Sequence, residues 1–296
     1  DLIWFDQATG QPTFAGTMPL KDETAFSATN DFLFIGTRTG VQVADPQNSG
    51  QLPSQLGLEQ EIHRLATADR NILLFLAMLG QTSKVALYDP SDPTNPKPVP
   101  LNQPVPLEFF TEFAINDHVL ASSITFGEFG YCNSRLTILD ISQPTNPQKT
   151  AEFDPQNCIS DLAGTQELLF VTGLSGLQIF STSDPANLKL LGQYTNPGGV
   201  QSVEDFLPGQ PTSYLIANEG RGSFIAAVNV AEEAQTLLGK TESQPNHALL
   251  ELFQFDQTLI ATAWNSGLLT FDISETGQIT QLFAPPLESE GLGSLH

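Results

Sequence analysis

The sequence predicts an all-β fold: a seven-bladed β-propeller built from four-stranded antiparallel blades. Three observations carry this prediction. A strand-turn-strand unit recurs along the chain, its spacing is nearly constant, and the two ends of the chain read as parts of one further unit. Charged residues make up only 15% of the 296 residues and 21 residues are proline. This composition argues against long charged helices and coiled coils.

The repeated unit has an apolar strand, a short polar turn with glycine, a second apolar strand and a loop rich in Ser, Pro and Asn. The second strand ends in a polar anchor residue, and the anchors are Asp6, Asp45, Asp89, Asp140, Ser181, Asn229 and Asp272. Successive anchors lie 39 to 51 residues apart, and their mean spacing of about 44 is the length of a four-stranded propeller blade. Because side-chain oxygens at such positions accept N–H groups of the following turn, we interpret the anchors as turn-forming residues.

Each unit is predicted to contribute strands a to d, with strand a innermost in a ring. Strands b are expected at 32–36, 73–77, 119–123, 168–172, 214–218 and 259–263. Strands c are expected at 2–5, 41–44, 85–88, 136–139, 177–180, 224–228 and 268–271. Radially stacked sheets bury both faces, which accounts for strands that are apolar almost throughout.

A single domain over residues 1–296 is predicted. Its blades are expected at about 21–58, 59–101, 105–153, 157–194, 199–242 and 246–286, with a seventh formed by 287–296 together with 1–20. Residues 1–11 match 267–277, so the chain is predicted to open on strand c, with strand d at 13–18 and a strand a at 291–295. Seven units need about 310 residues. The shared blade is therefore predicted to be incomplete, either because the chain is a fragment of a longer polypeptide or because another segment fills the gap.

The strand that ends in Asp and continues into a Ser-x-Pro-x-Asn-Pro loop resembles the LVIVD repeat of bacterial and archaeal surface proteins. The best matches are residues 136–147, 85–96 and 176–194. The resemblance implies a β-propeller that is often secreted or attached to the cell surface. It implies no activity and no catalytic residues.

The net charge is −22, from 33 acidic and 11 basic residues. This sign opposes binding to nucleic acid or to an anionic membrane surface, because both need clustered Lys and Arg. No apolar run approaches the length of a membrane-spanning helix. The scarcity of Lys and Arg, with neutral polar residues in their place, favours an extracytoplasmic protein, either secreted or at the cell surface.

No phosphate-binding loop, dinucleotide fingerprint, zinc-protease motif or nucleophile elbow occurs in the sequence. We therefore predict a non-enzymatic binding or scaffold module without a cofactor, whose partner is a protein or a cell-surface glycan. Two alternatives stay open. One is a propeller hydrolase or lyase with a carboxylate or metal site at the channel mouth. The other is a structural subunit of a surface assembly that accepts a strand at the open seventh blade.

An insert at residues 125–132 lengthens one predicted b–c loop beyond the equivalent loops. Long loops on a rigid scaffold often carry binding. The candidate binding residues of this loop are Phe126, Glu128, Phe129 and Tyr131.

The only two cysteines, Cys132 and Cys158, are predicted to form a disulfide. Cys132 belongs to the predicted b–c loop of the third blade, and Cys158 lies in the d–a connection that leaves the same blade. Both connections are expected at the same mouth of the ring. A disulfide there agrees with an oxidising compartment. Two separate buried thiols are the alternative.

Polar residues near the start of the innermost strands are predicted to line the channel mouth. They are Arg64, Glu112, Asp161, Ser202, Glu251 and Ser294, with His63 and His247 slightly above them. Three of these residues are carboxylates and one is arginine, and a narrow channel focuses their field. The hypothesis is a funnel for a divalent cation or for a cationic group of a partner. The alternative is that these side chains only face channel water.

Overall fold

The computed structural model is all-β, as predicted. Its described residues form six four-stranded sheets and one two-stranded sheet, and every strand pair is antiparallel. For some residues within the strands, the structure describes the backbone but not the side chain. The structure describes residues 2–5, 12–16, 23–28, 33–44, 54–57, 62–67, 73–79, 82–89, 92, 96–103, 105, 112–116, 118–128, 131–155, 158–165, 167–196, 199–203, 212–219, 222–229, 236–241, 249–255, 257–263, 267–274 and 278–283.

The strands of each sheet follow one another along the chain. The two-stranded sheet contains β1 (Leu2–Phe5) and β2 (Pro12–Gly16). The next two sheets contain β3 (Glu23–Ala28), β4 (Leu33–Thr37), β5 (Gly40–Ala44) and β6 (Ser54–Gly57), and then β7 (Ile62–Thr67), β8 (Leu73–Leu79), β9 (Thr82–Asp89) and β10 (Lys97–Pro98).

The fourth and fifth sheets contain β11 (Glu112–Ile115), β12 (Val119–Glu128), β13 (Tyr131–Asp140) and β14 (Gln148–Phe153), and then β15 (Ile159–Thr165), β16 (Leu168–Gly173), β17 (Gly176–Ser181) and β18 (Lys189–Thr195). The last two contain β19 (Val200–Val203), β20 (Thr212–Glu219), β21 (Gly222–Asn229) and β22 (Thr236–Lys240), and then β23 (Leu249–Phe255), β24 (Thr258–Ala263), β25 (Gly267–Ile273) and β26 (Ile279–Phe283).

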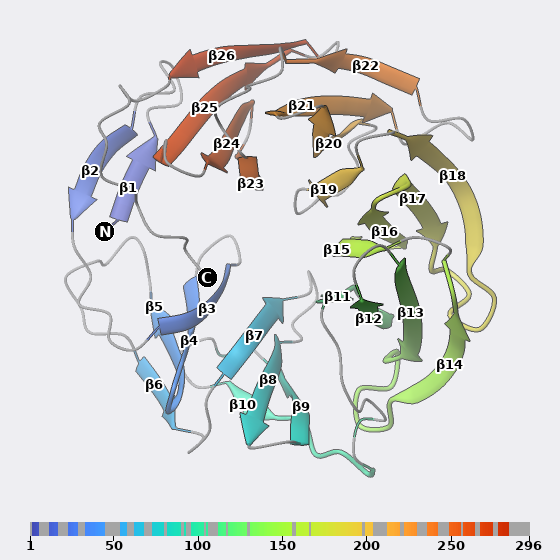
Figure 1. Ribbon diagram of the computed structural model, residues 1–296. Helices are drawn as coiled ribbons and strands as arrows, with labels where there is room; N and C mark the ends of the chain where they lie inside the picture. Colours follow the sequence, from blue (N-terminus) through green and yellow to red (C-terminus); the bar gives the residue numbers. More distant parts are fainter. Residues whose placement is uncertain are drawn as a thin grey trace.

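Figure 1 shows the sheets standing side by side around a ring, with the first strand of each four-stranded sheet innermost and the fourth outermost. The innermost strands contact their neighbours in sequence order, from β3 through β7, β11, β15 and β19 to β23. The strands predicted as b and c are all present. The predicted strand d at 13–18 is β2 at Pro12–Gly16, and the predicted strand a at 291–295 lies outside the described residues.

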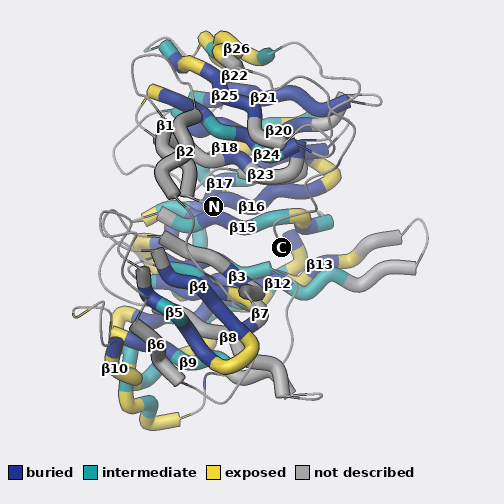
Figure 2. Tube along the Cα trace, turned by 90° about the vertical axis from the view of Figure 1, so that its left-hand side faces the viewer, coloured by how far each residue is buried: buried dark blue, intermediate teal, exposed yellow. Residues whose placement is uncertain are grey.

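The core consists of layers between neighbouring sheets. In β21, Phe224, Ala226 and Val228 pack against the sheet of β15–β18. The alternate residues Ile225 and Ala227 pack against the sheet of β23–β26. Side chains of a strand point alternately to its two faces, so a strand buried on both faces is apolar throughout. Figure 2 shows the outcome, with exposed residues on outer strands such as β26 and buried residues in the strands between.

Two of the strand-end anchors, Asp140 and Ser181, form turns as predicted. Asp140 Oδ1 accepts the backbone N–H of Ser142 at 2.8 Å and its hydroxyl at 2.6 Å. In the next sheet the Ser181 hydroxyl oxygen accepts the N–H of Ser183 at 3.4 Å. These bonds satisfy backbone groups where the chain leaves the ladder. Among the described residues, no helix has the length and apolar character needed to cross a membrane.

One buried hydroxyl in β20 lacks a hydrogen-bond partner. Ser213 is fully buried, and its hydroxyl oxygen has no hydrogen-bond partner. Ser213 pairs with Val228 just as Leu169 pairs with Phe180 in the preceding sheet, so a hydroxyl occupies a core position. We expect Ser213→Ala to raise the free energy of unfolding by about 1 kcal/mol, because it removes an unsatisfied polar group.

Chemical denaturation of the two proteins measures this difference. Ser134→Ala is the matched control, because the Ser134 hydroxyl accepts the N–H of Ile159 at 2.9 Å. That variant should lose about 1–2 kcal/mol. A Ser213→Ala protein less stable than wild type would contradict the prediction.

Candidate functional site

Most of the innermost strands share a backbone irregularity near their start, whereas β11 pairs with β12 in continuous register. The pairing register shifts by one residue between Ile62 and Arg64 in β7, between Ile159 and Asp161 in β15, and between Val200 and Ser202 in β19. The same shift lies between Leu249 and Leu252 in β23. A β-bulge of this kind inserts one extra residue and re-aims the side chains beside it. The bulges put Arg64, Asp161, Ser202 and Glu251 at equivalent positions of their strands.

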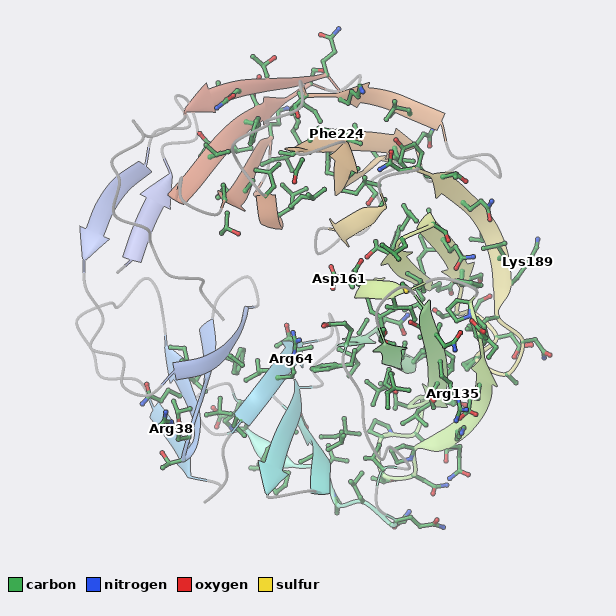
Figure 3. All side chains as sticks on the ribbon, viewed as in Figure 1. Arg38, Arg64, Arg135, Asp161, Lys189 and Phe224 are labelled. Atoms are coloured by element: carbon green, nitrogen blue, oxygen red, sulfur yellow. The ribbon has the colours of Figure 1, made fainter. Side chains whose placement is uncertain are left out.

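The structure brings together two of the residues that were predicted to line the channel mouth. Arg64 of β7 donates a hydrogen bond from Nη2 to Oε1 of Glu112, in β11 of the next sheet, at 3.0 Å. Figure 3 shows Arg64 and Asp161 at the inner border of the ring. The Asp161 carboxylate accepts the N–H of Leu162 at 2.8 Å. Because Arg64 offsets the charge of Glu112, the negative charge at the channel mouth is smaller than the three predicted carboxylates would give.

The structure describes less of the other residues that were predicted to line the channel mouth. For His63, Ser202 and Glu251 the structure describes the backbone, in β7, β19 and β23, while His247 and Ser294 lie outside the described residues. In the described part of the chain, no group of three His, Cys, Asp or Glu side chains is placed to hold a metal ion. The cation site therefore stays a prediction that depends on Asp161 and Glu251.

The surroundings of the Glu112 carboxyl shift its pKa. Burial raises the pKa of Glu112 above its ordinary value of 4.5, although the Arg64 guanidinium opposes this shift. A group with a raised folded-state pKa contributes stability below its unfolded pKa and loses that contribution as the pH rises through the folded pKa. Gln is neutral at every pH, so the melting temperature of Glu112→Gln relative to wild type should increase from about pH 4 to about pH 7.

Glu152 provides a control, because its pKa is shifted in the opposite direction to that of Glu112. A hydrogen bond from the Lys149 ammonium lowers the pKa of Glu152, and Arg135 acts in the same direction. Its contribution to stability is present above the unfolded pKa and is lost as the pH falls through the folded pKa. The melting temperature of Glu152→Gln relative to wild type should therefore decrease over the same pH range. Parallel pH profiles of the two variants would contradict the assignment for Glu112.

The predicted long b–c loop is a continuation of two strands, which corrects the sequence-based expectation. β12 and β13 stay paired from Val119 and Asp140 out to Glu128 and Tyr131. By comparison, β16 and β17 end at the pair Gly173 and Gly176. In Figure 2 β12 and β13 extend to one side of the ring. Of the predicted binding residues, Phe126 and Glu128 belong to β12 and Tyr131 to β13, whereas Phe129 lies outside the described residues.

This β12–β13 hairpin is fixed to the next sheet at its base. The Ser134 hydroxyl oxygen accepts the N–H of Ile159, the first residue of β15. The Thr125 hydroxyl lies 3.3 Å from the Ile159 carbonyl oxygen, to which it donates, and 2.9 Å from the Ser134 hydroxyl. Cys158, adjacent to Ile159, is disulfide-bonded. The base of the hairpin is therefore held by side chains at both of its strands.

A cavity of about 260 Å³ lies beside this base. The residues that line it are Asn133, Ser134, Arg135, Glu152, Phe153 and Asp154. The Arg135 Nη1 atom is 3.6 Å from Glu152 Oε1, and the Lys149 ammonium also contacts Glu152. These side chains are 33–59% exposed, so the ion pairs contribute little to stability. The cavity wall combines an aromatic ring, an amide and charges of both signs.

Sequence reasoning did not identify this cavity. Its lining comes from the start of β13 and the end of β14, and none of these residues belongs to a recognisable motif. The usable signal was Pro155, which follows the last cavity residue. Proline cannot donate to a ladder, which agrees with β14 stopping short of the extended β13.

Comparison with known proteins supports the fold. No family model matches the chain, and no curated protein matches it. Kluyvelomyces marxianus Hsv2 aligns with a TM-score of 0.60 and 10% identity, covering 95% of this chain and 90% of that one. The computationally designed Ika8 protein aligns with a TM-score of 0.58 and 13% identity, covering 92% of this chain and 74% of that one. At these identities the likeness concerns the fold alone, a propeller-like arrangement of antiparallel sheets.

Proposed function

We propose that this protein is an extracytoplasmic, non-enzymatic binding module, built as a seven-bladed propeller of the LVIVD-repeat type. It binds a protein or a cell-surface glycan through the β12–β13 hairpin and the cavity beside it. In this proposal the sheet of β1 and β2 is the seventh blade, which the C-terminal residues complete. The rest of the ring acts as a rigid support.

The observation that carries the proposal is the anchored hairpin. Its strands continue to the pair Glu128 and Tyr131, while its base is bonded to the next sheet through Thr125 and Ser134. A long projecting element that is rigid at its base loses little conformational entropy on binding, which favours affinity. An element with only a structural role has no need to extend beyond its neighbours in the sheet.

The proposed location is supported by two further observations. Acidic residues outnumber basic residues 33 to 11, a balance that keeps the chain away from nucleic acid. Cys158 is disulfide-bonded, and disulfides persist in oxidising compartments. Both observations agree with the surface or secreted proteins that the repeat resembles.

The experiment compares wild type with a variant in which Glu128, Phe129 and Tyr131 are all alanine. The two proteins are assayed on arrays of surface glycans and of extracellular protein domains. A ligand that binds wild type should bind the triple variant at least about tenfold more weakly, a loss of about 1.4 kcal/mol. The substitutions leave Cys132 and the anchoring hydroxyls in place.

The control variant changes Gln143, Thr145 and Gln148 to alanine, since these residues are exposed and belong to the opposite end of the same sheet. This control should bind like wild type. Wild-type protein that binds no array component, or a triple variant that binds as well as wild type, would overturn the proposed role of the hairpin.

A further inference from the structure

One edge of β13 is open beside the cavity. β14 pairs with β13 only from Leu136, opposite Phe153, onward to Asp140. β12 continues to pair with β13 as far as Tyr131. In the described part of the chain, residues 131–135 of β13 therefore have a strand partner on one side only. Pro155 is buried two residues after Phe153, and because it has no N–H it cannot continue the ladder.

The cavity occupies the place that a continued β14 would take. Phe153 packs into the layer between the sheet of β11–β14 and the sheet of β15–β18, and Ser134 bonds to β15 from the same face. Arg135 and Glu152 adjoin these residues along their strands and point to the opposite face, because side chains alternate. A single cavity lined from both faces lies in the plane of the sheet, beyond its last paired residues.

The open edge and the cavity have the dimensions of one short strand. Five residues of β13, at about 3.4 Å per residue, give an edge of about 17 Å. The cavity of about 260 Å³ is slightly smaller than the range of about 300–1,000 Å³ that holds a drug-sized ligand. It suits a side chain of a peptide whose backbone pairs with the edge.

Charge selects among the possible occupants. The chain carries a net charge of −22, so two copies repel each other and a basic segment is attracted. Arg135 in the cavity wall and Lys149, which contacts Glu152, balance the charges of Glu152 and Asp154, so the whole molecule supplies the attraction. The Phe153 ring offers an apolar contact to a residue of the added strand.

We infer that the open edge of β13 is a strand-addition site for an extended peptide of net positive charge. The peptide pairs with residues 131–135 and places an apolar side chain against Phe153. Main-chain hydrogen bonds supply affinity, and the cavity supplies selectivity for alternate side chains. This inference rests on the proposed binding function and names the ligand class of the same face.

The test uses acetyl-Lys-Val-Thr-Val-Lys-amide as a probe, titrated calorimetrically into the full chain. Two N-methylated forms carry the methyl groups on alternate residues, at the two valines or at the threonine and the second lysine. Only one of these sets of N–H groups faces β13 in an added strand. We expect one methylated form to lose binding and the other to keep it. Equal binding by both forms, or no binding by the parent peptide, overturns the inference.

Variants of the protein locate the peptide. Asn133→Trp places a large side chain at the cavity wall from an exposed position, and it should weaken binding at least about tenfold. Gln193→Trp is the matched control at an exposed position of β18, and it should bind the probe like wild type. The peptide with Glu in place of both Lys should bind more weakly. Equally tight binding of that acidic peptide, or self-association that Asn133→Trp abolishes, would contradict a basic peptide as the occupant.

The experiments distinguish failure of the proposed binding by the hairpin from failure of strand addition at the β13 edge. Array binding that is lost in the variant with Glu128, Phe129 and Tyr131 changed to alanine, together with peptide binding that Asn133→Trp keeps, leaves the role of the hairpin standing and overturns strand addition. Peptide binding that is lost in Asn133→Trp, together with array binding that the variant with Glu128, Phe129 and Tyr131 changed to alanine keeps, supports the edge and overturns the role of the hairpin tip.

Discussion

Replacing Gly176 with alanine is expected to destabilise the protein by at least about 3 kcal/mol. Gly176 opens β17 with a φ of 117°, a conformation that residues with a side chain rarely adopt. A β-carbon there would lie 2.0 Å from the Tyr194 carbonyl oxygen and 3.0 Å from the Thr195 α-carbon. Both atoms belong to the backbone of β18, so relief of the clash requires the outer strand to shift.

Thermal and chemical denaturation of Gly176→Ala measure this loss. Leu174→Ala is the control, because Leu174 lies in the same turn and is 67% exposed. That change should alter the free energy of unfolding by less than about 0.5 kcal/mol. If Gly176→Ala were as stable as Leu174→Ala, the tight approach of β17 and β18 at this turn would be wrong.

Breaking the disulfide is expected to cost about 3 kcal/mol. Cys158 is disulfide-bonded and no described cysteine is free. The sequence contains one other cysteine, so we propose the pair Cys132 and Cys158. A cross-link over this separation of 26 residues restricts the unfolded chain, and the chain-entropy model assigns it about 3 kcal/mol.

Cys158→Ser, Cys132→Ser and the double variant should all lose the same stability, because each of them removes the same bond. Thiol titration of the denatured, unreduced wild type should detect no free cysteine. Two titratable thiols, or additive losses in the double variant, would contradict the pairing.

Local pattern accounts for the parts of the fold that were predicted well. The strands that contain Leu136–Leu139 and Leu177–Phe180 were recognisable because burial of both faces makes them largely apolar, with one polar residue in each run, Thr137 or Gln178. The turn after Asp140 was recognisable because a carboxylate at a strand end has a nearby N–H group to bind. Both signals depend on residues within one turn or strand, so neither requires knowledge of the neighbouring sheets.

The sequence of the hairpin resembles a loop, although its residues form two paired strands. Gly127, Gly130 and the polar residues around them interrupt the apolar pattern, and glycine is unfavourable within strands. Pairing along the whole length of β12 and β13 compensates for this low propensity. Ser134 and Thr125 add hydrogen bonds to Ile159, a residue of the next sheet that no local pattern connects to them.

The sequence by itself determined the all-β class, the order of the strands and the turns between them, because these follow from alternation and turn chemistry along a short stretch of chain. Only the tertiary structure decided which side chains meet. Arg64 and Glu112 are separated by 48 residues, and their ion pair depends on how two neighbouring sheets approach each other at the ring's inner border. The open edge of β13 likewise exists because β14 stops at Phe153, before Pro155, while β13 extends beyond that point. Such differences in length between paired strands arise from packing across sheets, which is why the cavity between Arg135 and Asp154 became visible only in the folded chain.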